Sequence, residues 1–168
     1  MIRRLLPIIL LLFSSACSEQ QTPNFKPEKA TTFSFIDGSK KKLRDFTGQW
    51  LVVNFWSVSC PPCFQEMPEL ARLYTRPDSD SFELIGVAMP YDRPDMILET
   101  QQRKQLPYPL AIDIKGEVNR AFGIVQVVPT SFLLNPDGDI VWQHAGIVTY
   151  DALKKELVDQ QSIYKERK

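Results

Sequence analysis

The hydrophobic pattern of the chain centres on one apolar run, residues 50–56, which lies just before a Cys-Pro-Pro-Cys sequence at 60–63. The run is rich in β-branched and aromatic residues, so it predicts a buried strand. After the second cysteine the apolar residues change to a helical spacing, and those that share one face are Phe64, Met67, Leu70, Ala71 and Tyr74. The two cysteines therefore lie where a strand leads into a helix.

The same periodicities predict the remaining elements. Before this strand and helix we expect a β-hairpin over 31–43, with its turn at Asp37-Gly38. After them we expect a strand over 82–89, a helix over 94–104, a short apolar element over 110–112, a helix over 117–122, a hairpin over 131–142 and a final helix from Thr149. This order contains a βαβ unit, which requires a parallel sheet. It predicts an α/β domain with a mixed sheet and helices on both faces.

Local signals mark the ends and bends of these elements. Asp92 is expected to cap the helix over 94–104, and Thr149 is expected to cap the final helix. Pro68 lies inside the helix that follows the cysteines, so we expect a kink there.

Composition narrows the class of protein. The chain has 168 residues, of which 43% are hydrophobic and 24% charged, and its formal net charge is zero. These values are typical of one globular domain with a proper core. The charge pattern gives no indication of nucleic-acid binding.

The N-terminal segment resembles a bacterial lipoprotein signal. Arg3 and Arg4 precede a short apolar core over 5–13, and small residues precede Cys17. The core is too short to span a bilayer, which takes about 20 residues. One departure is Ser14, which stands where the usual lipobox has leucine.

This resemblance sets the expected organisation of the chain: a signal peptide over 1–16, a tether over 17–29 and one domain over 30–168. The protein is then exported to the periplasm and anchored to a membrane through a lipid on Cys17. The alternative is an ordinary cleaved signal, with Cys17 a free thiol.

Cys60 and Cys63 are the candidate reactive groups. Cys60 is expected at the first turn of the helix, where free backbone N–H groups and the helix dipole favour a thiolate, the nucleophilic form of cysteine. We therefore expect Cys60 to be more acidic than a free thiol, whose pKa is about 8.5, although the apolar surroundings of the site act in the opposite direction. Helical spacing places Cys63 inward and Cys60 outward, as for a resolving and an attacking thiol. The alternatives are a structural disulfide or half of a zinc site, but zinc needs four ligands, and the chain has one histidine and no second Cys-x-x-Cys.

With these residues in view, the chain resembles the exported TlpA/ResA/CcmG-like thiol-disulfide oxidoreductases of the thioredoxin superfamily, over about residues 30–165. The motifs that carry the resemblance are Asn54-Phe55-Trp56 running into Cys60-Pro61-Pro62-Cys63, then Glu66-Met67-Pro68, and Val128-Pro129-Thr130 further on. It implies a thioredoxin-like α/β fold with an N-terminal β-hairpin extension and a helical insert.

The resemblance also implies roles for individual residues. Pro129 matches a cis proline that lies across from the active disulfide and leaves the backbone before it, at Val128, free to pair with a substrate chain. Pro61 and Pro62 are expected at the border of the same substrate site. Trp56 is expected to pack in the core and to border the site as well, and the alternative for it is a purely structural role in the core. Ser59 departs from the usual tryptophan before the first cysteine, which makes the rim of the site smaller and more polar.

Glu66 is the candidate for moving protons. Asn54 stands where cytosolic thioredoxins have a buried aspartate, and an amide cannot shuttle a proton, so Glu66 is expected to take that role one helical turn after Cys63. The alternative is a solvated helix charge. For comparison, Glu69 is expected on the solvent side, and the single histidine, His144, is assigned no chemistry.

Together these features predict an enzyme that exchanges thiols and disulfides with protein substrates and needs no metal or other cofactor beyond its own dithiol. The resemblance favours a reductant, for example in cytochrome c maturation or copper-site assembly, recharged by a membrane electron donor of the DsbD/CcdA kind. Two alternatives are a copper-binding chaperone of the Sco kind and a peroxiredoxin-type peroxidase. The first uses cysteines spaced by three residues, and the second a Pro-x-x-x-Thr-x-x-Cys motif; neither pattern is present at Cys60.

Overall fold

The computed structural model describes residues 26–76 and 82–167 and contains every element that the sequence predicts. The elements are β1 (Thr32–Phe35), β2 (Lys40–Lys42), the 3₁₀ helix η1 (Leu43–Phe46), β3 (Trp50–Trp56), α1 (Pro61–Tyr74), β4 (Phe82–Ala88), α2 (Pro94–Lys104), β5 (Leu110–Ile112), α3 (Glu117–Ala121), β6 (Thr130–Leu134), β7 (Ile140–Ala145) and α4 (Tyr150–Glu166). The predicted signal segment, Cys17 and most of the expected tether lie outside the described residues. None of the helices described combines the length and apolar character needed to cross a bilayer.

The strands form one mixed sheet of seven strands in the order β2-β1-β5-β4-β3-β6-β7. β3 lies near its centre, parallel to β4 and antiparallel to β6. The short apolar element over 110–112 is β5, which pairs parallel with β4 and antiparallel with β1. It thereby joins the N-terminal hairpin to the rest of the sheet.

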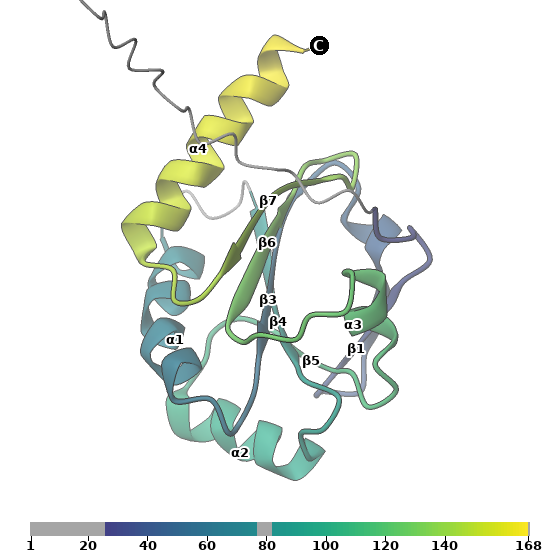
Figure 1. Cartoon of the computed structure of the whole chain (residues 1–168), viewed down its shortest axis with the longest axis vertical. Helices are drawn as coiled ribbons and strands as arrows, with labels where there is room; N and C mark the ends of the chain where they lie inside the picture. The colour runs from purple at the N-terminus through teal and green to yellow at the C-terminus, as the bar shows by residue number, and fades with distance from the viewer. Residues whose placement is uncertain (1–25, 77–81, 168) are drawn as a thin grey trace, which may run out of the picture.

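Helices cover both faces of this sheet (Figure 1). On one face α1, α2 and α4 bury Leu70, Ile97 and Leu153 against alternate residues of β3 such as Val52. On the other face η1 and α3 pack against β1 and against the intervening β3 residues, with Phe55 at the centre. Because side chains alternate along a strand, β3 serves both cores, and all seven of its residues are buried.

The two ends of the strands differ in what they carry. β3 ends at Trp56 and leads into α1 at the same end where β6 begins, since Phe55 pairs with Thr130. At the opposite end, Lys26 forms an ion pair with Asp139, which precedes β7. The last residues of the expected tether contact the domain, because Pro27 is buried and the Lys29 carbonyl accepts a hydrogen bond from the Arg44 N–H.

Most predicted caps and turns are confirmed. Thr149 caps α4 by accepting a hydrogen bond from the Ala152 N–H, and Gly38 adopts the left-handed conformation that the first hairpin turn requires. The prediction for Asp92 is wrong. The N-cap of α2 is Arg93, whose side chain makes no capping bond, and the Asp92 carboxylate bonds elsewhere because it points to the loop after β3.

Candidate active site

Cys60 and Cys63 form a disulfide where β3 leads into α1. Cys60 is the N-cap of the helix, Pro61 and Pro62 occupy its first two positions, and Cys63 is the third. Proline suits these positions because its fixed φ fits the helix and its missing N–H would have no partner there. Cys60 is 7% exposed and Cys63 1%, so Cys60, the expected attacking residue, is the more accessible of the two, although both are largely buried.

The helix end acts directly on the outer sulfur. The Cys63 N–H donates to the Cys60 Sγ over 3.1 Å, in the way that a Ser or Asp side chain accepts a bond at an N-cap. A thiolate formed at Cys60 would keep this donor and would also lie at the positive end of the helix dipole. Local geometry therefore stabilises the nucleophilic form of Cys60.

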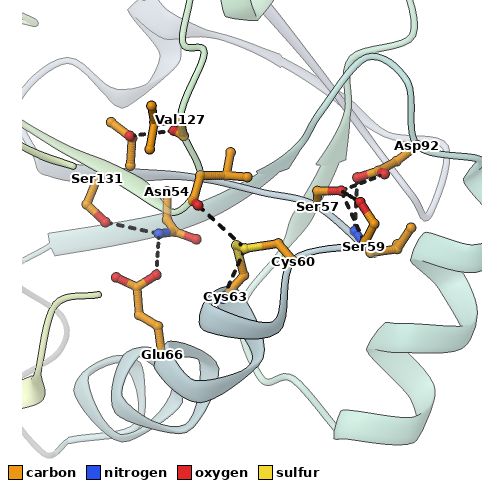
Figure 2. Close-up of a disulfide and its surroundings, with 12 residues drawn as sticks. Asn54, Ser57, Ser59, Cys60, Cys63, Glu66, Asp92, Val127 and Ser131 are labelled. Carbon is orange, nitrogen blue, oxygen red and sulfur yellow. Dashed lines mark hydrogen bonds between the residues drawn. A yellow bond between two sulfur atoms is a disulfide. The ribbon is translucent and has the colours of Figure 1, made fainter. Parts of the chain in front are cut away.

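A second backbone segment borders the disulfide from the opposite side. The Val128–Pro129 peptide bond is cis, as the resemblance implies, and the Cys60 Sγ lies 3.6 Å from the Val128 carbonyl oxygen (Figure 2). In the disulfide this sulfur carries no proton, so the approach is a contact; a Cys60 thiol could donate across it. Val127, just before, is 61% exposed, so the segment is open to solvent beside the disulfide.

Glu66 is buried behind the disulfide, 1% exposed, and is not a solvated helix charge. Its Oε2 accepts from the Asn54 Nδ2 over 3.0 Å, and its Oε1 accepts from the Val148 N–H over 3.0 Å. Asn54 also donates to the Ser131 Oγ (Figure 2). Burial raises the pKa of Glu66 to about 7, and the hydrogen bonds from Val148 and Asn54 oppose that rise.

A carboxyl group with this pKa exchanges its proton near neutral pH, which is the condition for general acid–base catalysis. Glu66 and Cys63 are three residues apart on α1, so their Cβ atoms lie about 5–6 Å from each other. Burial raises the pKa of Tyr108, and the negative charge of Glu66 adds to that rise. The structure thus places a carboxyl group that can exchange its proton near neutral pH one helical turn from Cys63.

A second carboxylate, Asp92, lies on the other side of the Cys60 loop. It is 7% exposed and accepts from the Ser57 Oγ over 2.9 Å and from the Val58 N–H over 3.1 Å. Ser57 in turn contacts Ser59 (Figure 2). Burial raises the pKa of Asp92, and its hydrogen bonds with Ser57, Val58 and Met89 oppose the rise. In the sequence, Asp92 follows a strand end, where α/β sheets often place ligand-contacting loops, but the start of a helix was the favoured interpretation, so its bonds to the loop before Cys60 were not predicted.

The remaining predicted residues are distributed between surface and core. Pro61 and Pro62 are exposed beside the disulfide, whereas Trp56 is 1% exposed and packs in the core, so its role as a substrate contact stays a prediction. The Trp56 indole lies against Gly86, where an added Cβ would come within 3.3 Å of Nε1 and 2.6 Å of the Leu110 Cδ2. Only glycine therefore fits in β4 beside this ring.

Two further residues lie away from the dithiol. Glu69 is half-buried and accepts from the Tyr150 N–H over 2.9 Å, so it supports the start of α4 and does not simply face solvent. His144 is exposed on β7 and stacks on Trp142, with ring centroids 5.6 Å apart. Among residues 26–76 and 82–167, no three His, Cys, Asp or Glu side chains cluster as metal ligands would.

A Cys-Pro-Pro-Cys disulfide at a helix N-terminus, facing a cis proline at the edge of a mixed sheet, defines a thioredoxin-like thiol-disulfide oxidoreductase. The chain belongs to the AhpC/TSA family, whose model matches residues 19–143. It is 32% identical over 139 residues to the thiol-disulfide oxidoreductase ResA of Bacillus thuringiensis subsp. konkukian, covering 82% of this chain and 75% of that protein. It is 33% identical over 137 residues to ResA of Halalkalibacterium halodurans, covering 81% and 73%. The crystal structure of StoA from Bacillus subtilis matches with a TM-score of 0.66 and 29% identity, covering 74% of this chain and 92% of that one.

Proposed function

We propose that this oxidoreductase is an exported, membrane-tethered reductant of protein disulfides. The export and the tether rest on the lipoprotein-like signal that ends at Cys17. The observation that carries the reductant direction is Glu66, a buried carboxyl group with a pKa of about 7, one helical turn from Cys63. When ionised it disfavours thiolates nearby, so it favours the disulfide over the reduced pair. The Glu66 charge thus opposes the stabilisation that the helix N-terminus gives to the Cys60 thiolate. A dithiol whose reduced form is less stabilised gives up its electrons more readily, in contrast to DsbA, whose stabilised reduced form makes it a strong oxidant.

The reaction proceeds in two exchanges. The Cys60 thiolate attacks one sulfur of the substrate disulfide, that bond breaks, and the leaving thiolate takes up a proton. The resulting mixed disulfide is then attacked by Cys63 at the Cys60 Sγ, which releases the second substrate thiol and forms the Cys60–Cys63 bond. The substrate gains two electrons and two protons, and the dithiol loses them.

Glu66 serves the second exchange. Cys63 is 1% exposed, so no bulk water reaches it readily to remove its proton before it attacks. Glu66 lies on the same helix face, and its carboxylate can accept that proton at neutral pH. Val128 and Pro129, beside the Cys60 sulfur, would pair with the substrate backbone, with Pro61 and Pro62 at the border of the contact.

The cellular partners follow from the proposed location. Cys17 would carry a lipid, residues 17–29 would tether the domain, and a membrane electron donor of the DsbD/CcdA kind would keep the dithiol reduced. Substrates would be periplasmic protein disulfides, such as those of apocytochrome c or a copper-site assembly protein. An oxidising compartment requires such a donor because dithiols there are otherwise lost to disulfides.

Redox equilibration tests the direction. The Cys60–Cys63 couple, titrated in glutathione or dithiothreitol buffers, should have a potential in the thioredoxin range, about −270 mV. A value near that of DsbA, about −120 mV, would make the protein an oxidant and overturn the proposal. The midpoint of Cys60 alkylation against pH, expected below about 8.5, measures the stabilisation of its thiolate independently.

Trapping tests the substrates. Cys63→Ser removes the resolving thiol, so in cells this variant should accumulate mixed disulfides with exported proteins, while Cys60→Ser should accumulate none. Identification of the trapped proteins by mass spectrometry names the substrate class. Equal trapping by both variants would contradict Cys60 as the attacking thiol.

Intact-mass measurement tests the anchor. The mature protein should begin at Cys17 with the added mass of lipid, and it should partition into detergent. A Cys17→Ser variant should be found in the aqueous phase. An unmodified N-terminus in the wild-type protein would rule out lipidation while leaving export possible.

A further inference from the structure

The loop between β3 and Cys60 contains two linked hydroxyl groups, and the second belongs to Ser59, the residue just before Cys60 in sequence. Ser57 is fully buried, and its Oγ donates to the Asp92 Oδ1 over 2.9 Å. The Ser57 Oγ also accepts from the Ser59 N–H over 3.2 Å and lies 3.0 Å from the Ser59 Oγ (Figure 2). These contacts link a buried carboxylate to an exposed hydroxyl next to Cys60 in sequence.

The direction of each bond in this chain is fixed by counting protons. A serine hydroxyl has one proton to donate and two lone pairs that accept. Ser57 donates its proton to Asp92, so in the 3.0 Å contact the Ser59 hydroxyl must be the donor. The proton of Ser59 then points inward, and its oxygen presents lone pairs outward, at the exposed side of the loop.

Two further hydrogen bonds fix the position of Asp92, so that its carboxylate can accept the Ser57 proton. Its second oxygen accepts from the Val58 N–H over 3.1 Å, and its own N–H donates to the Met89 carbonyl. The Ser57 carbonyl accepts from the Cys60 N–H over 3.1 Å. Ser57 therefore both donates to Asp92 and helps to position the start of α1. The carboxylate comes from the loop after β4, which is a separate element from the loop that it orders.

We propose that Asp92 acts through Ser57 to fix the Ser59 hydroxyl as a hydrogen-bond acceptor beside Cys60, and that this acceptor binds an N–H donor of the substrate polypeptide next to the cysteine under attack. Asp92 is thus a positioning residue, and Ser59 determines specificity. Where the rim of the site carries Ser59, recognition is polar and directional. The proposal rests on Cys60 as the attacking thiol of the proposed function.

Two small disulfides test the acceptor directly. One is a symmetric dialkyl disulfide ending in N-methylamides, which have an N–H donor; the other is its N,N-dimethylamide analogue, which has none. Second-order rate constants for oxidation of the reduced protein should favour the donor probe by about fivefold, the effect of one neutral hydrogen bond. A ratio of one in the wild-type protein would overturn the proposal. Changes in Cys60 nucleophilicity cancel in this ratio, because they affect both probes equally.

Variants then assign the preference to residues. Ser59→Ala should reduce the ratio to about one, and Ser59→Thr, which keeps the hydroxyl, should retain it. Ser59 is exposed, so both variants should keep the wild-type fold. Asp92→Asn presents an amide that donates to Ser57; this frees the Ser57 proton for Ser59 and should abolish or reverse the preference. If Ser59→Ala keeps the ratio, or Asp92→Asn keeps it, the relay is wrong.

Asp113→Asn is the matched control for Asp92→Asn. Asp113 is a similarly buried carboxylate, 6% exposed, that accepts from the Val118 and Asn119 N–H groups at α3. Asp113→Asn should lose comparable stability and keep the wild-type ratio of rate constants for the two probes. A ratio of about one in this variant would show that the preference is lost through general destabilisation of the fold, and would overturn the proposal. Cys60→Ser should react with neither probe, which tests the attacking thiol separately from its rim.

Discussion

The two faces of the sheet bury side chains of different chemistry. On the α3 face the core is aromatic: the Phe122 ring lies 5.5 Å from that of Phe55 and 5.2 Å from that of Phe132, both edge to face. On the α1 face the same strand, β3, contributes Asn54, which meets the buried carboxyl of Glu66. Both faces gain stability from apolar burial, but the α1 face also places the Asn54 and Glu66 side chains in its core, where each must be satisfied by hydrogen bonds.

Because the two faces differ in this way, substitutions on them should affect different properties of the protein. Changes on the α3 face should alter the free energy of unfolding and leave the dithiol chemistry intact. Changes on the α1 face should alter the proton and thiol equilibria, with stability effects that depend on pH. The following variants test this division, from the largest expected effect to the smallest.

Phe122→Ala should have the largest effect on stability. The side chain is 1% exposed, and loss of a buried phenyl ring costs about 3–5 kcal/mol. Urea unfolding of the oxidised protein measures the loss, and the alkylation midpoint of Cys60 should stay at its wild-type value. A shifted midpoint would show that the two faces are not independent.

Glu66→Gln should remove a pH-dependent part of the stability. The pKa of Glu66 is raised from 4.5 to about 7 on folding, so the folded state holds its proton more tightly than the unfolded chain does. The associated stability is fully present below pH 4.5 and is lost as pH rises through 7, a change on the order of 3 kcal/mol. Urea unfolding at several pH values should show this slope in the wild-type protein and a flatter one in the variant.

The same variant should change the chemistry. Without the negative charge the thiol titration should move to lower pH, and the exchange rate should fall by about a hundredfold or more if Glu66 accepts the Cys63 proton. Glutamine can still accept from the Val148 N–H and donate to a rotated Asn54 amide, so the fold should survive. An unchanged rate and titration would reduce Glu66 to a structural role.

Asn54→Leu should have a smaller effect on stability. It keeps the approximate volume but removes the donor to Glu66 and Ser131, and an unsatisfied buried group costs about 1–3 kcal/mol. The Asn54 hydrogen bond lowers the pKa of Glu66, so its loss should move the stability slope to higher pH. A slope at the wild-type position would contradict the coupling between the two side chains.

Glu69→Gln should have the smallest effect. Its carboxylate accepts from the Tyr150 N–H, a bond that the glutamine oxygen can keep, so stability should change by less than about 0.5 kcal/mol. The thiol titration and exchange rate should match the wild-type values. A titration shifted as far as in Glu66→Gln would show that any charge change on α1 suffices.

The sequence predicted the elements and the dithiol because these depend on local patterns. Hydrophobic periodicity defines β3 and α1, and the position of Cys-Pro-Pro-Cys between these two patterns places Cys60 at the start of the helix. Burial of Glu66 remained open, since it depends on Asn54 and on the Val148 N–H, 82 residues away in sequence. Asp92 was missed for the same reason: it resembles a helix cap locally, but its partner Ser57 is 35 residues away.

The ion pair between Lys26 and Asp139 places Lys26 at the end of the sheet opposite the disulfide. Lys26 lies at the end of the strands where β6 finishes and β7 begins, and the disulfide lies at the end where β3 finishes. The seven residues of β3 separate these ends by roughly 20 Å. If a membrane anchors the chain before Lys26, the dithiol lies at the end of the domain far from the membrane and is accessible to soluble proteins. A membrane-embedded electron donor must then either extend a domain of its own to the dithiol or react when the anchored domain reorients toward the membrane.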